Sequence, residues 1–321
     1  MAVDSAEWLR LMEAEYLSEF VPEGGSAIKF AVVPDDAKAD ELRASLMALG
    51  ESHQMVCAHI DSAETKLHMI QDVFFGVARQ IDWNTSAQSF LERLFRKQGY
   101  QWPNPGQPMT VQALSAANDV DPTILRREKN QWLTSEIMRE PGMAQDFRIA
   151  MTRLCEERFV PESPLGASAA PPVLEWLKGD LRAIGPLKSA QIFAKITRTN
   201  ARPMLRSLCR WLRMLGHGGL MLTIDIRRLA MSLPAGSPGI RYTAAAVMDA
   251  FEVLRQLIDN ADQFDGLFLV VIAGEPFIGN DQKRSIEAYT ALKMRIWDDV
   301  RARDRDNPLS PLTTLAWSTA P

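Results

Sequence analysis

One apolar run, Gly218 to Arg227, constrains the fold of this chain more than any other stretch. Two glycines open the run, apolar residues fill most of its middle, and Asp225 stands near its end. Such a short apolar run predicts a strand that is buried on both faces, as strands of a parallel sheet are. Because open α/β sheets bind ligands at the carboxyl ends of their strands, Asp225 is a candidate site residue.

Similar patterns along the chain predict alternating strands and helices. Strands are expected at 27–33, 55–60, 266–274 and 312–317, with helices at 5–20, 37–49, 63–81, 86–97, 110–117, 121–138, 143–159, 173–179, 188–215, 242–262 and 282–303. A loop rich in Pro, Ser, Ala and Gly is expected at 161–172. We therefore predict a three-layer α/β domain with a mainly parallel sheet.

The helical middle of the chain contains no expected strand. We predict that residues 1–83 and 186–321 form the two halves of the α/β core, and that residues 84–185 are a helical insertion forming a lobe of its own. An insertion of this size is large enough to have its own hydrophobic core.

Composition argues against a polyanion-binding charge, a metal site and a membrane span. The 321 residues have a net charge of −4, so no global charge for binding polyanions is present. The three cysteines are far apart and the four histidines are scattered, so no metal site is expected. The sequence also lacks an apolar run of the roughly 20 residues that cross a bilayer. We expect a cytoplasmic protein that does not bind membranes.

The turn after the first strand is where a P-loop nucleotide hydrolase binds phosphate. Such a loop needs glycines, a lysine for the β- and γ-phosphates, and a Ser or Thr for Mg²⁺. Here the turn has no glycine, and it reads Val33-Pro34-Asp35-Asp36-Ala37-Lys38-Ala39-Asp40-Glu41. Like charges about 4 Å apart repel by roughly 4 kcal/mol near a protein surface. The turn therefore predicts a lost nucleotide site, in which Lys38 and Asp36 are remnants.

Several segments resemble the P-loop ATPases of BREX-type phage-resistance clusters, and the likeness covers nearly the whole chain. They are Phe20–Phe30, Ile196–Arg202, Gly219–Asp225, Leu254–Asp259, Arg284–Arg295 and Asn307-Pro308. The resemblance implies an AAA+-like ATPase core that works in a multi-protein defence system on DNA. ATP-binding relatives place a glycine-lysine-serine/threonine loop after the first strand, and a glutamate after the strand-end aspartate. This chain has Pro34 to Asp40 and Ile226 at those places.

Arginines form a second candidate site. Arg198, Arg202, Arg206, Arg210 and Arg213 recur at spacings of four and three, which places them along one stripe of the helix expected at 188–215. Such a row suits DNA phosphates or an acidic partner protein. The same row is also compatible with a solvated helix face.

Two further arginines, Arg284 and Arg295, resemble in position the trans-acting arginine fingers that lie at subunit interfaces of this class. We therefore name them as candidate interface residues, although an ordinary surface role is the favoured explanation.

Three hypotheses follow. The favoured one is a pseudo-ATPase that needs no cofactor and contacts other subunits of a defence complex, with DNA and further copies of the chain as possible partners. The second is a weak ATPase that binds ATP and Mg²⁺ through Lys38, Asp225 and Glu275. The third is a nucleic-acid-binding module that uses the arginine stripe.

Overall fold

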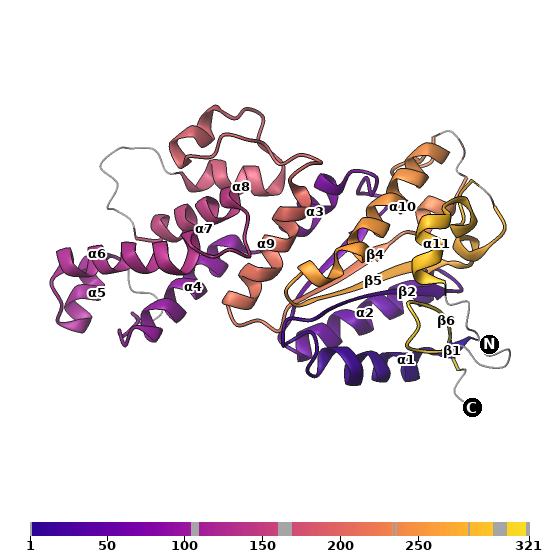
Figure 1. Ribbon diagram of the computed structural model, residues 1–321, viewed down its shortest axis with the longest axis horizontal. Coiled ribbons are helices and arrows are strands. Elements are labelled where there is room, and N and C mark those ends of the chain that lie inside the picture. The colour runs from indigo at the N-terminus through magenta and orange to yellow at the C-terminus, as the bar shows by residue number, and fades with distance from the viewer. Residues whose placement is uncertain are drawn as a thin grey trace. The chain divides into compact units, whose positions relative to one another are not determined.

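The computed structural model describes residues 2–103, 109–159, 169–232, 234, 236–281, 283–297 and 307–318. The chain divides into two compact units (Figure 1). Unit 1 contains Met1–Val77 and Gly216–Pro321, and unit 2 contains Ala78–Leu215. The domain limits predicted above, at residues 84 and 185, remain a proposal.

Unit 1 is built on a six-stranded sheet in which every strand pair is parallel. The strands are β1 (Val3–Asp4), β2 (Ser26–Val33), β3 (Val56–Asp61), β4 (Leu220–Asp225), β5 (Leu267–Gly274) and β6 (Leu312–Ala316). Their order across the sheet is β1-β6-β2-β5-β4-β3. This arrangement confirms the predicted α/β class with a P-loop NTPase-like parallel sheet. The two-residue strand β1 was not predicted.

The helices of unit 1 come from both of its chain segments. They are α1 (Ser5–Met12), which continues as a π-helix over Glu13–Leu17, α2 (Asp36–Ser52), α3 (Ile70–Ala78), α10 (Ala244–Asp259) and α11 (Thr290–Ile296). Short 3-10 turns lie at Arg227–Ala230, Ala261–Gln263, Glu275–Ile278 and Ile286–Ala288.

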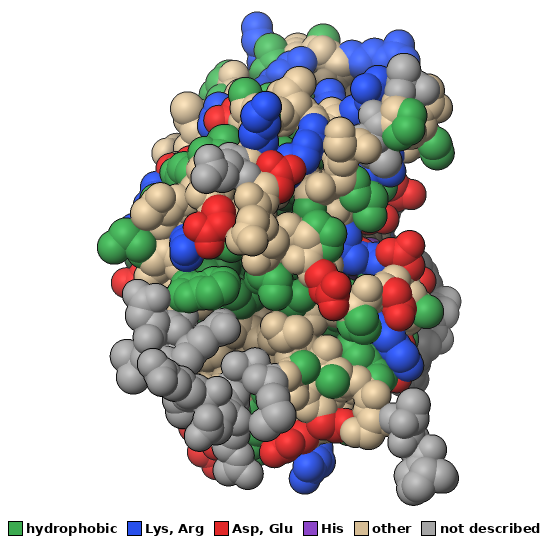
Figure 2. All heavy atoms as spheres, turned by 90° about the vertical axis from the view of Figure 1, so that its right-hand side faces the viewer, with side chains coloured by type: hydrophobic (Ala, Val, Ile, Leu, Met, Phe, Trp, Pro, Cys, Tyr) green, Lys and Arg blue, Asp and Glu red, His purple; other side chains and the backbone are tan. Residues whose placement is uncertain are grey.

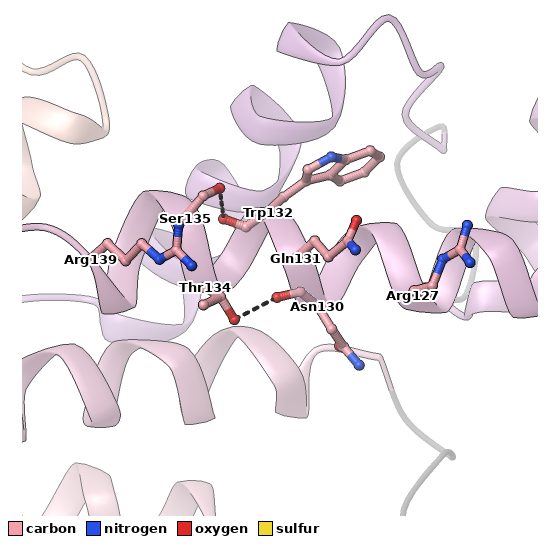
Figure 3. A pocket seen from close by; sticks show the side chains of 7 residues that line it. All are labelled: Arg127, Asn130, Gln131, Trp132, Thr134, Ser135 and Arg139. Carbon is pink, nitrogen blue, oxygen red and sulfur yellow. Dashed lines mark hydrogen bonds between the residues drawn. The ribbon is translucent and has the colours of Figure 1, made fainter.

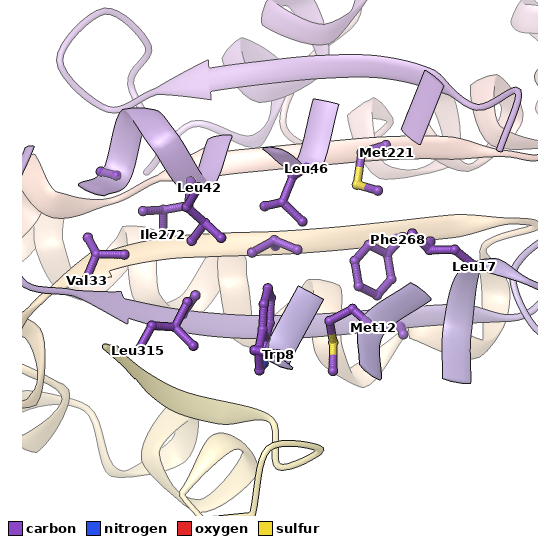
Figure 4. Close-up of a cluster of buried hydrophobic side chains, with 14 of the residues drawn as sticks. Trp8, Met12, Leu17, Val33, Leu42, Leu46, Met221, Phe268, Ile272 and Leu315 are labelled. Carbon is purple, nitrogen blue, oxygen red and sulfur yellow. The ribbon is translucent and has the colours of Figure 1, made fainter. Parts of the chain in front are cut away.

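One face of the sheet is covered by α1 and α2. Trp8 and Met12 of α1 and Leu42 and Leu46 of α2 are buried at helical spacing, in one cluster with Phe268 and Ile272 of β5 (Figure 4). Burying each of these side chains contributes on the order of 1.5–3 kcal/mol. This contact anchors α2, and so it fixes the turn that joins β2 to α2.

The opposite face is covered by α10 and the turn that follows β5. Phe277 of that turn stacks on Phe30 of β2, with ring centroids 6.1 Å apart, and meets Phe251 of α10 edge-on at 5.7 Å. Figure 1 shows α10 and α2 on opposite sides of the strands. The sheet is therefore the middle of three layers, as predicted.

A pair of glycines lets β4 begin beside the start of β5. Gly219 has a φ of +134°, and a Cβ atom there would lie 2.3 Å from the carbonyl oxygen of Gly266. Since only glycine adopts this conformation without strain, residue 219 can be nothing larger. Gly219, the second of the two glycines that open the apolar run, is thus needed where β4 begins beside β5.

Unit 2 is helical within its described residues. Its helices are α4 (Trp83–Lys97), α5 (Val111–Asn118), α6 (Pro122–Leu133) continued by a π-helix over Thr134–Met138, α7 (Gln145–Glu157), α8 (Ala170–Lys178), a 3-10 turn at Gly185–Ala190 and α9 (Ala201–Met214). The ring of Phe95 lies at the centre of an aromatic cluster with Tyr100, Trp102, Trp132 and Phe159.

Three helix predictions were wrong in extent. The expected helix 188–215 is α9 alone, because Pro203 has no N–H and its ring blocks a regular turn before it. The expected helix 63–81 is only Ile70–Ala78, and within 282–303 the described part holds a 3-10 turn and the short α11. Most of the loop expected at 161–172 lies outside the described residues.

No helix in the described ranges combines the length and the hydropathy needed to cross a bilayer.

Candidate functional site

The carboxyl ends of four strands meet at one edge of the sheet in unit 1. Val33 of β2 pairs in register with Gly274 of β5, and Asp225 of β4 pairs with Asp61 of β3. Because all strands are parallel, the turn that follows β2 lies at the same edge as Asp225. This edge is where the fold offers a ligand site.

The turn after β2 fills the amino end of α2 with its own carboxylate. Asp35 caps the helix, and its Oδ1 accepts the backbone N–H of Lys38 at 2.8 Å. Pro34 has no N–H to offer. A helix amino end attracts an anion through its free N–H groups and its dipole. Here the carboxylate of Asp35 already occupies the position of that anion.

Arg227 bridges two carboxylates across this edge. Its backbone N–H donates to Asp225 Oδ1 at 2.9 Å, and its Nε and Nη2 donate to Asp225 Oδ2 at 3.0 and 2.6 Å. Its Nη1 donates to Oδ1 of Asp36, at the start of α2. Both oxygens of Asp225 therefore accept hydrogen bonds from a single arginine, which in turn contacts the first residue of α2.

Burial strengthens this contact. The side chains of Arg227 and Asp225 are only 17% and 10% exposed, whereas that of Asp36 is 85% exposed. Burial by itself would lower the pKa of Arg227. The hydrogen bonds and the charge of Asp225, together with the charges of Asp36 and Asp40, outweigh burial, so the pKa of Arg227 is raised. The pair Arg227–Asp225 is thus the tightly held half of the bridge.

The aliphatic part of Arg227 lies over the end of β5. A Cβ atom on Gly274 would be 3.6 Å from Cγ of Arg227, in ordinary van der Waals contact. The small residue at 274 leaves room for the arginine to cross from β4 towards α2.

Lys38, the predicted remnant of a phosphate lysine, is engaged away from this bridge. Its Nζ lies 2.7 Å from Oε2 of Glu41 and 5.5 Å from the ring centre of Trp317, just after β6. Trp317 also donates from Nε1 to the other oxygen of Glu41 at 2.9 Å. Glu275, the second predicted acid, is exposed in the 3-10 turn after β5.

Next to the bridge, a half-buried histidine joins the edge strand β3 to its neighbour β4. His59 Nδ1 of β3 lies 2.8 Å from the hydroxyl oxygen of Thr223 on β4. Burial, followed by the charge of Arg43, lowers the pKa of His59. This contact stabilises the pairing of β3 with β4 beside Asp225.

The predicted arginine stripe is shorter than expected. Arg198 lies in the turn before α9, exposed to solvent, while the other four arginines lie on α9 itself. Arg210 donates to Glu140 at 3.0 Å, and Arg202, Arg206 and Arg213 also interact within the protein. These four side chains are half-buried, so they are less accessible to a ligand than a solvated stripe would be.

The two candidate interface arginines also contact their own unit. Arg284 donates to the backbone oxygens of Leu229 and Tyr242 at 3.2 and 2.9 Å. Arg295 donates to Asp259 of α10 and to the backbone oxygen of Ala291. Their roles at a subunit interface remain predictions.

Sequence reasoning missed the role of Arg227. An arginine two residues after a strand-end aspartate is a local pattern that predicts an ion pair. The contact with Asp36 joins residues 191 positions apart, which only the fold reveals. Among the described residues, no group of three or more His, Cys, Asp or Glu side chains is arranged to hold a metal ion.

Comparison with known proteins identifies one family. Residues 138–317 match the family model described as BREX system ATP-binding protein BrxC/D. Searches among curated proteins and among solved structures gave no match. The matched range covers more than half of the chain, from the end of the π-helix after α6 to the residue after β6. It contains Asp225 and Arg227, but not the turn after β2.

Proposed function

The chain belongs to the family of BREX system ATP-binding proteins BrxC/D, and we propose that it acts in such a phage-defence system as a subunit that does not hydrolyse ATP. The observation that carries this proposal is the bridge Asp225–Arg227–Asp36. It places a cation of the protein on the carboxylate that would otherwise be free for Mg²⁺.

A magnesium ion would have to displace Arg227. Both oxygens of Asp225 accept hydrogen bonds from that arginine. Freeing a buried guanidinium from its carboxylate costs about 3–5 kcal/mol, because the charge is left without a partner. Mg²⁺ binds through one or two carboxylates and substrate phosphates, and two carboxylates at this edge, Asp225 and Asp36, already accept hydrogen bonds from Arg227.

The triphosphate is disfavoured as well. Asp35, Asp36 and Asp225 carry three negative charges against the single positive charge of Arg227. A repulsion of roughly 4 kcal/mol for each close pair near the surface competes with about −8 kcal/mol for micromolar binding. Nor does the turn offer glycine N–H groups or a free lysine, since Lys38 is paired with Glu41. These residues do not fit a Mg²⁺-triphosphate complex.

A role through protein contacts suits the surface of unit 1. Hydrophobic side chains reach the surface on the face drawn in Figure 2, between acidic and basic ones. Three large apolar side chains of this unit are strongly exposed: Phe20 at 48%, Met231 at 41% and Met294 at 76%. Exposed apolar groups of this size are common at interfaces with other proteins. Other subunits of the defence system are the partners we propose.

A phage-restriction assay in cells that carry the complete system tests the proposal. Deleting the chain should abolish protection, while Lys38→Ala and Asp36→Asn should retain it, because neither side chain serves a bound nucleotide. Loss of protection by Lys38→Ala, with normal protein levels, would contradict the proposal.

The description of the family as ATP-binding favours one alternative. In that case Lys38, Asp225 and Glu275 rearrange around ATP and Mg²⁺, and the chain is a weak ATPase. The unaltered chain should then hydrolyse ATP, and replacing Asp225 by Asn should abolish that hydrolysis. If the unaltered chain does not hydrolyse ATP, this alternative is ruled out.

Contact with DNA through Arg198, Arg202, Arg206, Arg210 and Arg213 remains a separate proposal. Because four of these arginines already interact within the protein, they would have to exchange partners to bind phosphate. A double change, Arg206→Ala with Arg210→Ala, should then reduce the salt dependence of DNA binding.

A further inference from the structure

Positive charge is concentrated in unit 2. Residues 78–215 contain 20 Lys and Arg against 13 Asp and Glu, a formal charge of +7, whereas the rest of the chain contains 16 against 27, a charge of −11. The slight net charge of the whole chain therefore hides a basic unit and an acidic one. A basic unit of this size attracts polyanions over the distance of a Debye length.

A surface hollow of unit 2 lies along the continuous helix formed by α6 and its π-helical extension. It has a volume of about 570 Å³. Its lining consists of Arg127, Asn130, Gln131, Trp132, Thr134, Ser135 and Arg139. We call this surface the α6 groove. It contains no carboxylate, and its side chains are mostly hydrogen-bond donors. In Figure 3, Arg127 and Arg139 lie towards opposite ends of the helix, with the polar side chains between them.

The carboxylates of this helix are occupied elsewhere. Glu128 accepts the hydroxyl of Tyr100 at 2.6 Å, Glu136 pairs with Lys97 at 2.9 Å, and Glu140 pairs with Arg210 at 3.0 Å. The negative charges of the helix are thus held by residues outside the groove. As a result, they do not neutralise the arginines that line it.

The hydroxyls of Thr134 and Ser135 donate to backbone oxygens of their own helix, at 2.8 and 3.0 Å, so the donors that the groove offers to a ligand are its guanidinium and amide groups. Arg127 and Arg139 are exposed, and neither forms an ion pair within the described part of the chain. The exposed amides of Asn130 and Gln131 stand between them. Twelve residues of helix separate the two arginines, or about 18 Å at 1.5 Å per residue. That length matches about five phosphates of one strand at 3.4 Å each.

We propose that the α6 groove binds the phosphodiester backbone of a nucleic acid. The two guanidinium groups contact phosphates near the two ends of the groove, and the amides between them donate to phosphate or sugar oxygens. We favour a nucleic acid over an acidic protein surface because the two guanidinium groups lie about 18 Å apart, a distance that a regular row of phosphates matches. The proposal does not depend on the state of the nucleotide site in unit 1.

Fluorescence anisotropy with the full chain tests this proposal. The probes are a labelled 20-nucleotide single strand and the duplex of the same sequence, titrated at several KCl concentrations from about 50 to 200 mM. The unaltered chain should bind at least one probe, with an affinity that falls steeply with salt. The comparison of single strand with duplex shows which form the groove prefers.

The decisive variant is Arg127→Gln with Arg139→Gln. Losing two phosphate contacts should reduce the slope of log affinity against log salt by about 1.4–1.8. The matched control is Arg79→Gln with Arg96→Gln, which removes the same charge from exposed arginines of unit 2 that are already paired with Asp180 and Glu92. Its slope should stay close to that of the unaltered chain.

Three results would overturn the proposal: no binding to either probe at 50 mM KCl, equal slopes for the groove variant and the control, or equally strong competition by polyglutamate. The last result would assign the groove to an acidic protein instead. All four substituted side chains are exposed, so circular dichroism should show both variants folded like the unaltered chain.

Discussion

Arg227 donates to both carboxylate oxygens of Asp225, from its backbone N–H at 2.9 Å and from its Nη2 at 2.6 Å. The two residues are only two positions apart, at the end of the fully buried strand β4. A carboxylate at this edge is the natural ligand of a cation that accompanies a nucleotide. In this protein an arginine from the same turn donates hydrogen bonds to that carboxylate.

The ion pair should contribute strongly to stability. Replacing Arg227 by Met leaves the buried carboxylate of Asp225 without a partner, so the free energy of unfolding should fall by about 3–5 kcal/mol. Urea denaturation measures this change. The double variant Arg227→Met with Asp225→Asn should recover much of the loss, since no buried charge remains.

The exposed half of the bridge provides the control. Asp36→Asn removes a carboxylate that is 85% exposed, so it should lower the free energy of unfolding by less than about 1 kcal/mol. If Asp36→Asn and Arg227→Met destabilise the protein equally, the buried pair is not the dominant contact.

Because Lys29 is buried, the free energy of unfolding should rise with pH. Its side chain is 5% exposed in β2 and donates to the backbone oxygen of Leu309 at 2.6 Å. Burial lowers the pKa of Lys29 to about 8. Between pH 8 and 10.5 the unfolded chain holds a proton that the folded chain lacks, so raising the pH through this window favours folding by up to about 3 kcal/mol.

Chemical denaturation at pH 8 and pH 10 of the unaltered chain and Lys29→Met checks this prediction. The stability of the unaltered chain relative to the variant should be greater at pH 10 than at pH 8. A constant difference between the two proteins would show that Lys29 does not titrate in this range.

Because Glu252 is hydrogen-bonded as a carboxylate, the free energy of unfolding should fall in acid. Hydrogen bonds from Arg255, helped by those of Tyr289 and Gln256 and opposed by burial, lower the pKa of Glu252 to about 2. The stabilisation is present above the unfolded pKa of 4.5 and is lost as the pH falls towards 2. Unfolding of Glu252→Gln should depend less on pH between 4.5 and 2. Glu287→Gln, at an exposed carboxylate paired with Lys293, should retain the dependence of the unaltered chain.

Gly219 should not tolerate a side chain. Its positive φ and the nearness of the Gly266 oxygen predict that Gly219→Ala lowers the free energy of unfolding by at least about 1–3 kcal/mol from backbone strain alone. Gly185→Ala is the control, since a Cβ there meets no atom within 4 Å. Thermal unfolding of the two variants should therefore differ, and equal melting temperatures would exclude strain at Gly219.

The buried strands were the easiest part of the fold to predict. Apolar runs predicted β2 and β5 to within one residue, because strands buried on both faces leave an almost unbroken apolar pattern. The edge strand β3, which is only partly buried, was also predicted to within one residue. The helix expected at 188–215 failed because its apolar spacing outweighed the effect of Pro203. Periodicity shows which residues face a core, but it does not show where the backbone stops being helical.

The candidate site was only half predictable. Asp225 and the acidic turn after β2 could be recognised from the chain, because strand ends and helix starts leave local signals. The contact of Arg227 with Asp36 depends on how β4, β5 and β2 are ordered across the sheet. Likewise, the α6 groove depends on which carboxylates pair with residues of other helices, and sequence spacing does not determine such partners.

The central claim is that Arg227 and the carboxylates around it replace a bound Mg²⁺-nucleotide. Isothermal titration of the full chain with ATP and Mg²⁺ tests it most directly. We predict no saturable binding at nucleotide concentrations on the order of 1 mM, which corresponds to a binding free energy weaker than about −4 kcal/mol. Micromolar binding that Asp225→Asn abolishes would contradict the claim.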